Sequence, residues 1–187
     1  PGAVKIGSFF GLFETSADPL SAPWMFDMWL SAAEGDASGL AMLSLFGEMA
    51  WPTAFVWGET AGVSASTDLP GSLEYLAEAN LEDTILGTPG STWLWSGISG
   101  WPQADLLPEE YRHVQPSDVE TLLISGTVDF STPPQFARDE LLPSLSNGQQ
   151  IILEGFGHSH DTWTIQHAAT VQLVNSFFDT GVADASL

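Results

Sequence analysis

Two short apolar runs, at 122–124 and 151–153, constrain the fold of this chain most strongly. Leu122-Leu-Ile124 and Ile151-Ile-Leu153 are continuous rather than alternating. Continuous apolar runs are typical of strands that are covered on both faces, as in a parallel sheet. A helical pattern follows each run, which indicates a strand-helix-strand-helix unit with a right-handed crossover. The sequence therefore predicts an α/β fold.

The two helices of this unit are predicted from proline positions and apolar spacing. The first is expected over 133–142, with Thr132 as N-cap, Pro133 at the first position and Pro143 ending it. The second is expected over 162–179. Its apolar stripe comprises Ala168, Val171, Val174, Phe177 and Phe178.

Residues 1–115 differ in composition, being rich in Trp, Met, Gly and Ala, and we expect a mainly helical cap there. Pro23 in a first turn and Gly35 at an exit delimit one helix. Helices are expected at 24–34, 38–50 and 72–80, and long connections at 51–71 and 84–108. The chain is thus expected to have two regions, 1–115 and 116–187.

The chain has eight Trp and eleven Phe, many of them in the cap region. Aromatic side chains there can fill the core of the cap or line an apolar pocket for a bulky group. The residues concerned are Trp24, Phe26, Trp29, Phe46, Trp51, Trp57, Trp93 and Trp95. Core filling is favoured for most of them.

Charge argues against two classes of partner. The chain has 24 acidic and 3 basic residues, a formal net charge of −21, so no basic patch can attract nucleic-acid phosphates. The same holds for anionic membranes, and Glu48 and Pro52 interrupt the apolar stretch 39–57. We expect neither nucleic acid nor a membrane as partner. The acidity suits a high-salt or marine setting, or a charge that another chain or counterions in solution offset.

The ends and the cysteine content bear on processing. The chain has no cysteine, so neither disulfides nor thiolate chemistry is available. It begins with Pro1 and not with methionine, which predicts proteolytic cleavage, either in the cell or during preparation of the protein. We expect a secreted or extracytoplasmic location.

Asp129 and His158 are the candidate site residues. Each directly follows a predicted strand, and the carboxyl ends of parallel strands meet at the edge where functional groups gather. A carboxylate there can hold one imidazole nitrogen while the other faces a nucleophile. Singly, each residue is ordinary for a turn or loop. Their spacing, 158 − 129 = 29 residues, leaves both interpretations open.

Two parallel strands with their helices cannot bury both faces of a sheet or satisfy both of its edges. Isolated strand pairs are marginal even when antiparallel, and parallel pairing is slightly weaker. Residues 1–115 show no comparable alternation of strands and helices. We therefore expect a second polypeptide, the N-terminal part of the same gene product, to complete the sheet.

Two stretches carry a resemblance to a known family. Leu122–Arg138 contains the run Ser-Gly-Thr-Val-Asp-Phe-Ser-Thr-Pro-Pro, and Glu154–His158 reads Glu-Gly-Phe-Gly-His. Both resemble the C-terminal part of the α/β-hydrolases, in particular the tripeptidyl-aminopeptidase-like and proline-iminopeptidase-like group. The resemblance is strong over 119–178 and looser over 20–115. Shorter supporting matches are Gly35-Asp36 and Gly100-Trp101-Pro102.

The resemblance implies the C-terminal portion of an α/β-hydrolase: a helical cap plus the last two parallel strand-helix units, the sheet being completed by another chain or fragment. It implies that Asp129 orients His158, the general base of a Ser-His-Asp triad. The Gly-x-Ser-x-Gly nucleophile turn has no counterpart here. A companion N-terminal chain or fragment is therefore expected to supply the serine and most of the oxyanion hole.

The implied reaction is hydrolysis of a small peptide or ester through an acyl-enzyme. An aminopeptidase-like peptidase is the first choice and an esterase or lipase the second. An aminopeptidase needs carboxylates for the free amine of its substrate, and the cap offers Asp27, Glu34, Glu48 and Glu59. The alternative is a non-catalytic binding or interaction module with the same architecture.

Other local chemistry is weighed and not favoured. Ser64, Ser99 and Ser159 lack the strand-turn-helix setting of a nucleophile. A metal site is considered because His and Asp residues, which are common metal ligands, cluster after the second predicted strand. Their spacing does not match that of known metal-ligand motifs, so we expect no metal and no cofactor. The residues of that cluster are His158, His160, Asp161 and His167. His160 is the second choice as the base.

Overall fold

The computed structural model describes residues 2–16, 21–66, 74, 76–78, 86–98 and 107–186. The chain divides into two compact units, which are described separately. The first comprises Pro1–Phe10 and Met28–His113, and the second comprises Gly11–Asp27 and Val114–Leu187. The division at His113 lies beside the change in composition near residue 115, whereas residues 11–27 group with the C-terminal part.

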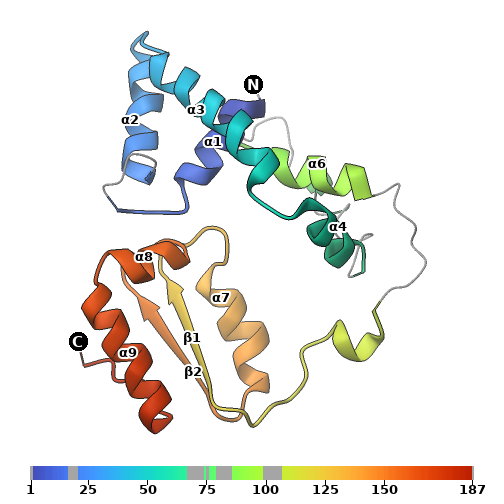
Figure 1. Ribbon diagram of the computed structural model, residues 1–187, viewed down its shortest axis with the longest axis vertical. Coiled ribbons are helices and arrows are strands. Elements are labelled where there is room, and N and C mark those ends of the chain that lie inside the picture. Colours follow the sequence, from blue (N-terminus) through green and yellow to red (C-terminus); the bar gives the residue numbers. More distant parts are fainter. Residues whose placement is uncertain are drawn as a thin grey trace. The chain divides into compact units, whose positions relative to one another are not determined.

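The second unit contains the predicted parallel strand pair. Strand β1 (Thr121–Gly126) pairs in parallel with β2 (Gly148–Leu153), with Thr121 opposite Gly148 and Gly126 opposite Leu153. A parallel bridge between Ser117 and Leu145 extends the pairing before the strands. Figure 1 shows α7 and α9 on opposite sides of the pair and α8 near the carboxyl ends of the strands. The described residues form no further strand.

The helix between the strands begins one residue later than predicted. Pro133 is the N-cap of α7 (Pro134–Phe136), and Thr132 is not, because its hydroxyl donates to Asp129 instead. The helical path continues beyond α7 through a π-helical turn, η3 (Ala137–Leu141), and a 3₁₀ turn, η4 (Leu142–Ser144). The predicted stop at Pro143 is therefore wrong, because a proline near the start of η4 needs no hydrogen-bonded N–H.

The single helix predicted over 162–179 is two helices. Helix α8 (Ser159–Thr164) and α9 (His167–Thr180) are separated at Gln166, whose φ of −133° and ψ of 57° are not helical. The Thr170 hydroxyl donates to the carbonyl of Thr162 across this break. Helix α9 ends at Gly181, whose φ of 74° fits the left-handed exit of a helix.

The face that α9 buries differs from the predicted stripe. Leu173 and Thr170 are buried, whereas Ala168 is exposed and Phe178 is 79% exposed. Val171, Val174 and Phe177 are half-buried.

The described part of residues 1–115 is largely helical, as composition indicated. Helices α1 (Gly2–Gly11), α2 (Ala22–Ala33) and α3 (Ser38–Ala50) lie in its first part. The predicted helices at 24–34 and 38–50 are confirmed as α2 and α3, and Gly35 after α2 has a φ of 106°. The predicted helix at 72–80 lies largely outside the described residues. Within that range only 74 and 76–78 are described, and these are helical.

The long connections predicted at 51–71 and 84–108 are wrong where helices occupy them. Residues there form η1 (Trp51–Thr53), α4 (Trp57–Ala65) and α6 (Pro89–Ile98), and η2 (Glu109–Tyr111) follows. Pro52 and Pro89 lie in first turns, where proline is tolerated because that N–H has no helical partner. Ala61, Ala65 and Ile98 form a small core here with Leu94 and Trp95.

No single helix in the described ranges is long and apolar enough to cross a membrane. Two consecutive helical segments, Ser38–Thr53 and Trp57–Ala65, have the length and composition of a membrane span only when taken together. The angle between these two segments is 72°.

Candidate active site

Asp129 lies in a tight turn at the carboxyl end of β1. The Val128 N–H donates to the Phe156 carbonyl at 3.1 Å, and the Asp129 N–H donates to the Gly126 carbonyl at 3.3 Å. The first bond ties this turn to the loop after β2, so the two strand ends stay together. Asp129 is only 7% exposed, which means that its carboxylate needs partners within the protein.

The Asp129 carboxylate has those partners in its own turn. Oδ1 accepts hydrogen bonds from the backbone N–H groups of Ser131 and Thr132, at 2.9 and 3.0 Å. Oδ2 accepts from the Thr132 hydroxyl at 2.7 Å. Burial by itself would raise the pKa of the Asp129 carboxyl, but hydrogen bonds from Thr132 and His158 outweigh it and hold this pKa below its usual value. Asp129 is therefore ionised at neutral pH.

His158 lies beside this carboxylate. It follows β2 through a turn at Gly155, whose φ is 76°, and it is the N-cap of α8. Its Nδ1 lies 2.9 Å from Oδ2 of Asp129 and 3.3 Å from the Thr132 hydroxyl. An ionised carboxylate can only accept, so Nδ1 carries the proton and Nε2 of a neutral ring is left as the basic nitrogen.

The imidazole of His158 is partly open to solvent. Its side chain is 31% exposed, compared with 5% for that of Asp129. Nε2 has no hydrogen-bond partner among the residues that the structure describes. The arrangement therefore has a buried, fixed acceptor on one side of the ring and an accessible base on the other, which is the geometry needed for proton transfer to and from a reacting group.

A segment far away in the sequence completes the surroundings of His158. The Phe13 carbonyl accepts from the His158 N–H at 2.7 Å, and the rings of Phe13 and His158 meet edge to face with centroids 5.1 Å apart. The ring of Phe130 packs edge to face against the ring of Phe13, with their centroids 5.2 Å apart. Sequence reasoning missed Phe13, because no local pattern connects it with a loop near residue 158.

Asp161 lies one turn after His158 and is fully buried. Its Oδ2 accepts from the Gly157 N–H at 2.7 Å, from the Thr15 N–H at 2.9 Å and from the Thr15 hydroxyl at 2.7 Å. Sequence analysis considered Asp161 only as a metal ligand. Its surroundings show another use, because it joins residues near the start of the chain to the histidine loop.

The other residues considered as metal ligands, His160 and His167, have hydrogen-bond or ion-pair contacts with groups other than Asp161. His160 Nε2 lies 3.7 Å from Oε2 of Glu14, and His167 Nδ1 lies 3.2 Å from the Trp163 carbonyl. No group of three or more His, Asp or Glu side chains within the described ranges could hold a metal ion.

The serines and carboxylates weighed from sequence belong to several different elements. Ser159 opens α8, Ser64 lies in α4, and Ser99 falls outside the described residues. The carboxylates suggested for binding a substrate amine are all exposed. They are Asp27, Glu34, Glu48 and Glu59.

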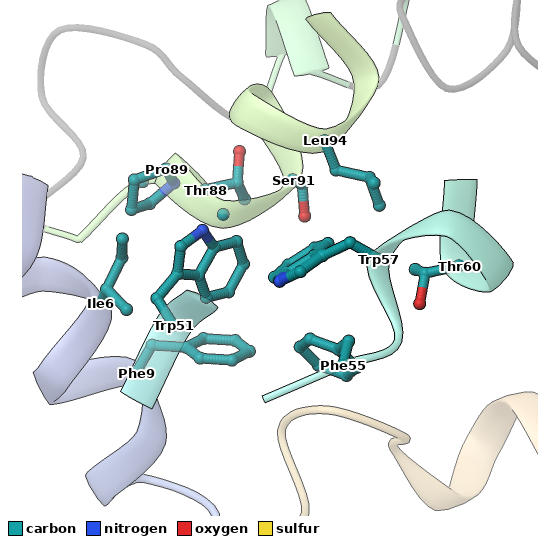
Figure 2. Close-up of a pocket in the computed structure, with 12 residues that line it drawn as sticks. Ile6, Phe9, Trp51, Phe55, Trp57, Thr60, Thr88, Pro89, Ser91 and Leu94 are labelled. Atoms are coloured by element: carbon teal, nitrogen blue, oxygen red, sulfur yellow. The ribbon is translucent and has the colours of Figure 1, made fainter. Parts of the chain in front are cut away.

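An aromatic pocket of about 290 Å³ lies in the first unit (Figure 2). Trp51 and Trp57 line it, with ring centroids 4.7 Å apart, together with Phe9 and Phe55. Among the described residues, no ionisable side chain lines the pocket. Of the aromatic residues considered from sequence, Trp51 and Trp57 thus line this pocket, whereas Trp24 and Phe26 are exposed.

The parallel strand-helix units, with Asp129 and His158 paired at the carboxyl ends of the strands, are the features expected of the C-terminal part of an α/β-hydrolase. Residues 88–186, just over half of the chain, match the family model described as TAP-like protein. The chain belongs to this family of the α/β-hydrolase superfamily, which indicates a hydrolase. No curated protein and no solved structure matches the chain.

Proposed function

We propose that the chain supplies the Asp and His of a serine hydrolase that cleaves a small peptide or an ester. One observation carries this proposal: the 2.9 Å contact between Nδ1 of His158 and the buried Oδ2 of Asp129. Three hydrogen bonds from the same turn hold that carboxylate: the backbone N–H groups of Ser131 and Thr132 donate to Oδ1, and the Thr132 hydroxyl donates to Oδ2. The pair is therefore organised before any substrate binds, as general base catalysis requires.

The proposed reaction begins at a serine on a companion segment. Nε2 of His158 takes the hydroxyl proton while the serine oxygen bonds to the substrate carbonyl carbon. The resulting imidazolium gives that proton to the leaving amine or alcohol as its bond to the carbonyl carbon breaks. Water then attacks the acyl-enzyme, with His158 again taking and returning a proton. Asp129 keeps the proton on Nδ1 and stabilises the imidazolium throughout.

The sheet supports the proposal that a companion segment is needed. In the described part of the chain, β1 and β2 pair only with each other, so each has an unpaired side. Leu122, Leu123 and Ile124 are only half-buried, and Ile152 is 42% exposed, although their continuous apolar pattern is that of fully covered strands. Further parallel strands with their helices would bury these side chains, and we propose that they come from the serine-bearing companion.

A fluorophosphonate probe, which reacts with activated serines, tests the proposal on a preparation holding all fragments of the gene product. We expect covalent labelling of a serine in the companion, located by intact mass measurement and peptide mapping. Asp129→Asn should slow labelling by about 10³- to 10⁴-fold, because the amide favours the wrong imidazole tautomer. Asp139→Asn is the matched control, since Asp139 is exposed and pairs with Arg138.

Two results would count against an enzyme. One is the absence of labelling in the complete preparation, and the other is an Asp129→Asn variant that labels at the wild-type rate while losing only stability. Either result favours the non-catalytic binding module.

Where labelling does occur, the rates of hydrolysis of aminoacyl amides and of simple esters are compared on the same preparation. This comparison decides between the aminopeptidase and the esterase form of the proposal.

A further inference from the structure

The backbone on both sides of His158 is held by one group of residues, which we call the histidine clamp: Phe13, Thr15, Gly157 and Asp161. The Gly157 N–H donates to Oδ2 of Asp161, and the next N–H, that of His158, donates to the Phe13 carbonyl. The His158 carbonyl accepts from the Asp161 N–H at 3.0 Å. Three successive backbone groups around His158 are thus fixed by hydrogen bonds.

Asp161 is central to the clamp because its carboxylate accepts hydrogen bonds both from the histidine loop and from Thr15. Its Oδ2 contacts Gly157 on one side and the backbone and hydroxyl of Thr15 on the other. The Thr15 hydroxyl also lies 3.1 Å from the Gly155 carbonyl, in the turn that leads to His158. A buried carboxylate with three donors on one oxygen is costly to replace, because removing it leaves those donors unpaired.

The packing at Gly157 shows how closely the clamp surrounds the loop. A Cβ at this position would lie 2.5 Å from the Phe13 carbonyl oxygen and 2.9 Å from Oδ2 of Asp161. These two atoms therefore occupy the space that a side chain at Gly157 would need. With the backbone fixed, the imidazole keeps only its side-chain torsions, and the Phe13 ring on one side and Asp129 on the other restrict these.

We propose that Asp161 is a positioning residue for His158, acting through the clamp and never touching substrate. The inference rests on the proposed function, in which Nε2 of His158 exchanges protons with a serine. A displacement of about 1 Å at a reacting group can cost about 100-fold in rate. Loosening the clamp should thus lower kcat and leave KM nearly unchanged, because substrate contacts are not altered.

Thr15→Val and Asp161→Asn test the proposal. Thr15→Val removes one hydroxyl donor with little change of shape, and Asp161→Asn removes the negative charge and replaces one acceptor by a donor. Asp179→Asn is the control, since Asp179 is an exposed carboxylate of α9 in the same unit. In the assembly with the serine-bearing companion, we expect kcat to fall about 10- to 100-fold in both clamp variants. KM should stay within about threefold of wild type, and the control should be unchanged.

An NMR measurement on the chain itself separates failure of the clamp from failure of the proposed function. With histidine labelled at the ring nitrogens, the Nδ1 proton of His158 is assigned by its loss in His158→Gln. We expect this signal in the wild type and the control, and its broadening or loss in Thr15→Val at a temperature where circular dichroism shows a folded chain. An unchanged signal in Thr15→Val and in any folded Asp161→Asn would overturn the proposal, whatever the activity.

The kinetic results have equally definite meanings. Wild-type kcat in both folded variants would overturn the positioning role. A fall in kcat that only follows the unfolded fraction would overturn it too, because Asp161 would then serve stability alone. If wild type itself shows no hydrolysis and no fluorophosphonate labelling, the proposed function fails and so does the catalytic consequence drawn for Asp161.

Discussion

Gly126 and Phe156 lie in direct backbone contact: a Cβ at Gly126 would be 2.1 Å from the carbonyl oxygen of Phe156. The same added atom would be 2.4 Å from the Gly157 carbonyl oxygen. Gly126 is the last residue of β1 and Gly157 immediately precedes His158. This close approach therefore lets the loop of His158 rest against the end of the strand that leads to Asp129.

Gly126→Ala should destabilise the second unit by about 2–4 kcal/mol, because backbone atoms would have to move to admit the methyl group. Gly155→Ala is the comparison, since a Cβ there meets nothing within 4 Å and only the φ of 76° opposes it. Its cost should be about 1–2 kcal/mol, the usual penalty for a left-handed residue. Urea unfolding followed by circular dichroism measures both. Equal costs would contradict the backbone contact.

Thr132→Val should change how stability depends on pH. The pKa of Asp129 is lowered in the folded chain, so its contribution to stability is present above the unfolded pKa of about 3.9 and is lost as pH falls through the folded pKa. Removing the Thr132 hydroxyl bond brings the folded pKa closer to the unfolded one. The gain in unfolding free energy as pH rises from about 2 to about 5 should therefore be smaller in the variant.

Thr164→Val is the control for the pH measurement, because the Thr164 hydroxyl is exposed and bonds only the His160 carbonyl. Its pH dependence should match wild type. If Thr132→Val also matches wild type, the hydroxyl does not stabilise the Asp129 carboxylate.

Leu173→Ala and Phe178→Ala should differ sharply, although both remove a large apolar side chain from α9. Leu173 is 3% exposed, so its truncation should cost about 2–5 kcal/mol. Phe178 is 79% exposed, so its truncation should stay within about 0.5 kcal/mol in the chain alone. Thermal unfolding of the two variants compares them directly. A large cost at Phe178 would restore the apolar stripe predicted from sequence.

Gly90→Ala should disturb the aromatic pocket. A Cβ at Gly90 would lie 2.5 Å from Cη2 of Trp51, whereas a Cβ at Gly97 in the same helix meets nothing within 4 Å. We expect Gly97→Ala to leave tryptophan fluorescence unchanged and to stabilise α6 by up to about 1 kcal/mol through helix propensity. Gly90→Ala should shift the emission spectrum and lose that gain. Identical spectra for both variants would contradict the packing of Trp51 on Gly90.

The parts predicted correctly are those with a short-range signal. The continuous apolar runs at 122–124 and 151–153 indicated β1 and β2 and their parallel pairing, and that pairing brings Asp129 and His158 to one edge. Their 2.9 Å contact follows from adjacent strands that end together, because both residues come a few positions after their strand.

The misses have two physical causes. A high content of Gly, Pro, Ser and Thr predicts connections at 51–71 and 84–108, although proline also fits the first turn of a helix, as Pro52 does in η1 and Pro89 in α6. The break at Gln166 between α8 and α9 carries no proline or glycine, and it depends on a contact between Thr170 and Thr162 that spacing does not reveal.

The clamp was missed for a different reason. Thr15 and Asp161 are 146 positions apart, and neither belongs to a periodic pattern. The burial of Asp161 is what makes its contact with Thr15 important for the structure, because a hydrogen bond between an exposed Thr and an exposed Asp contributes little.

From the 146-residue separation of Thr15 and Asp161, we expect their contact to form late in folding. Closing so wide a loop costs chain entropy before any bond can repay it, and contacts of this range form slowly. During synthesis, Thr15 leaves the ribosome long before Asp161 is translated. The imidazole is therefore expected to reach its working position among the last steps of maturation, so an unfinished chain would have no ordered base.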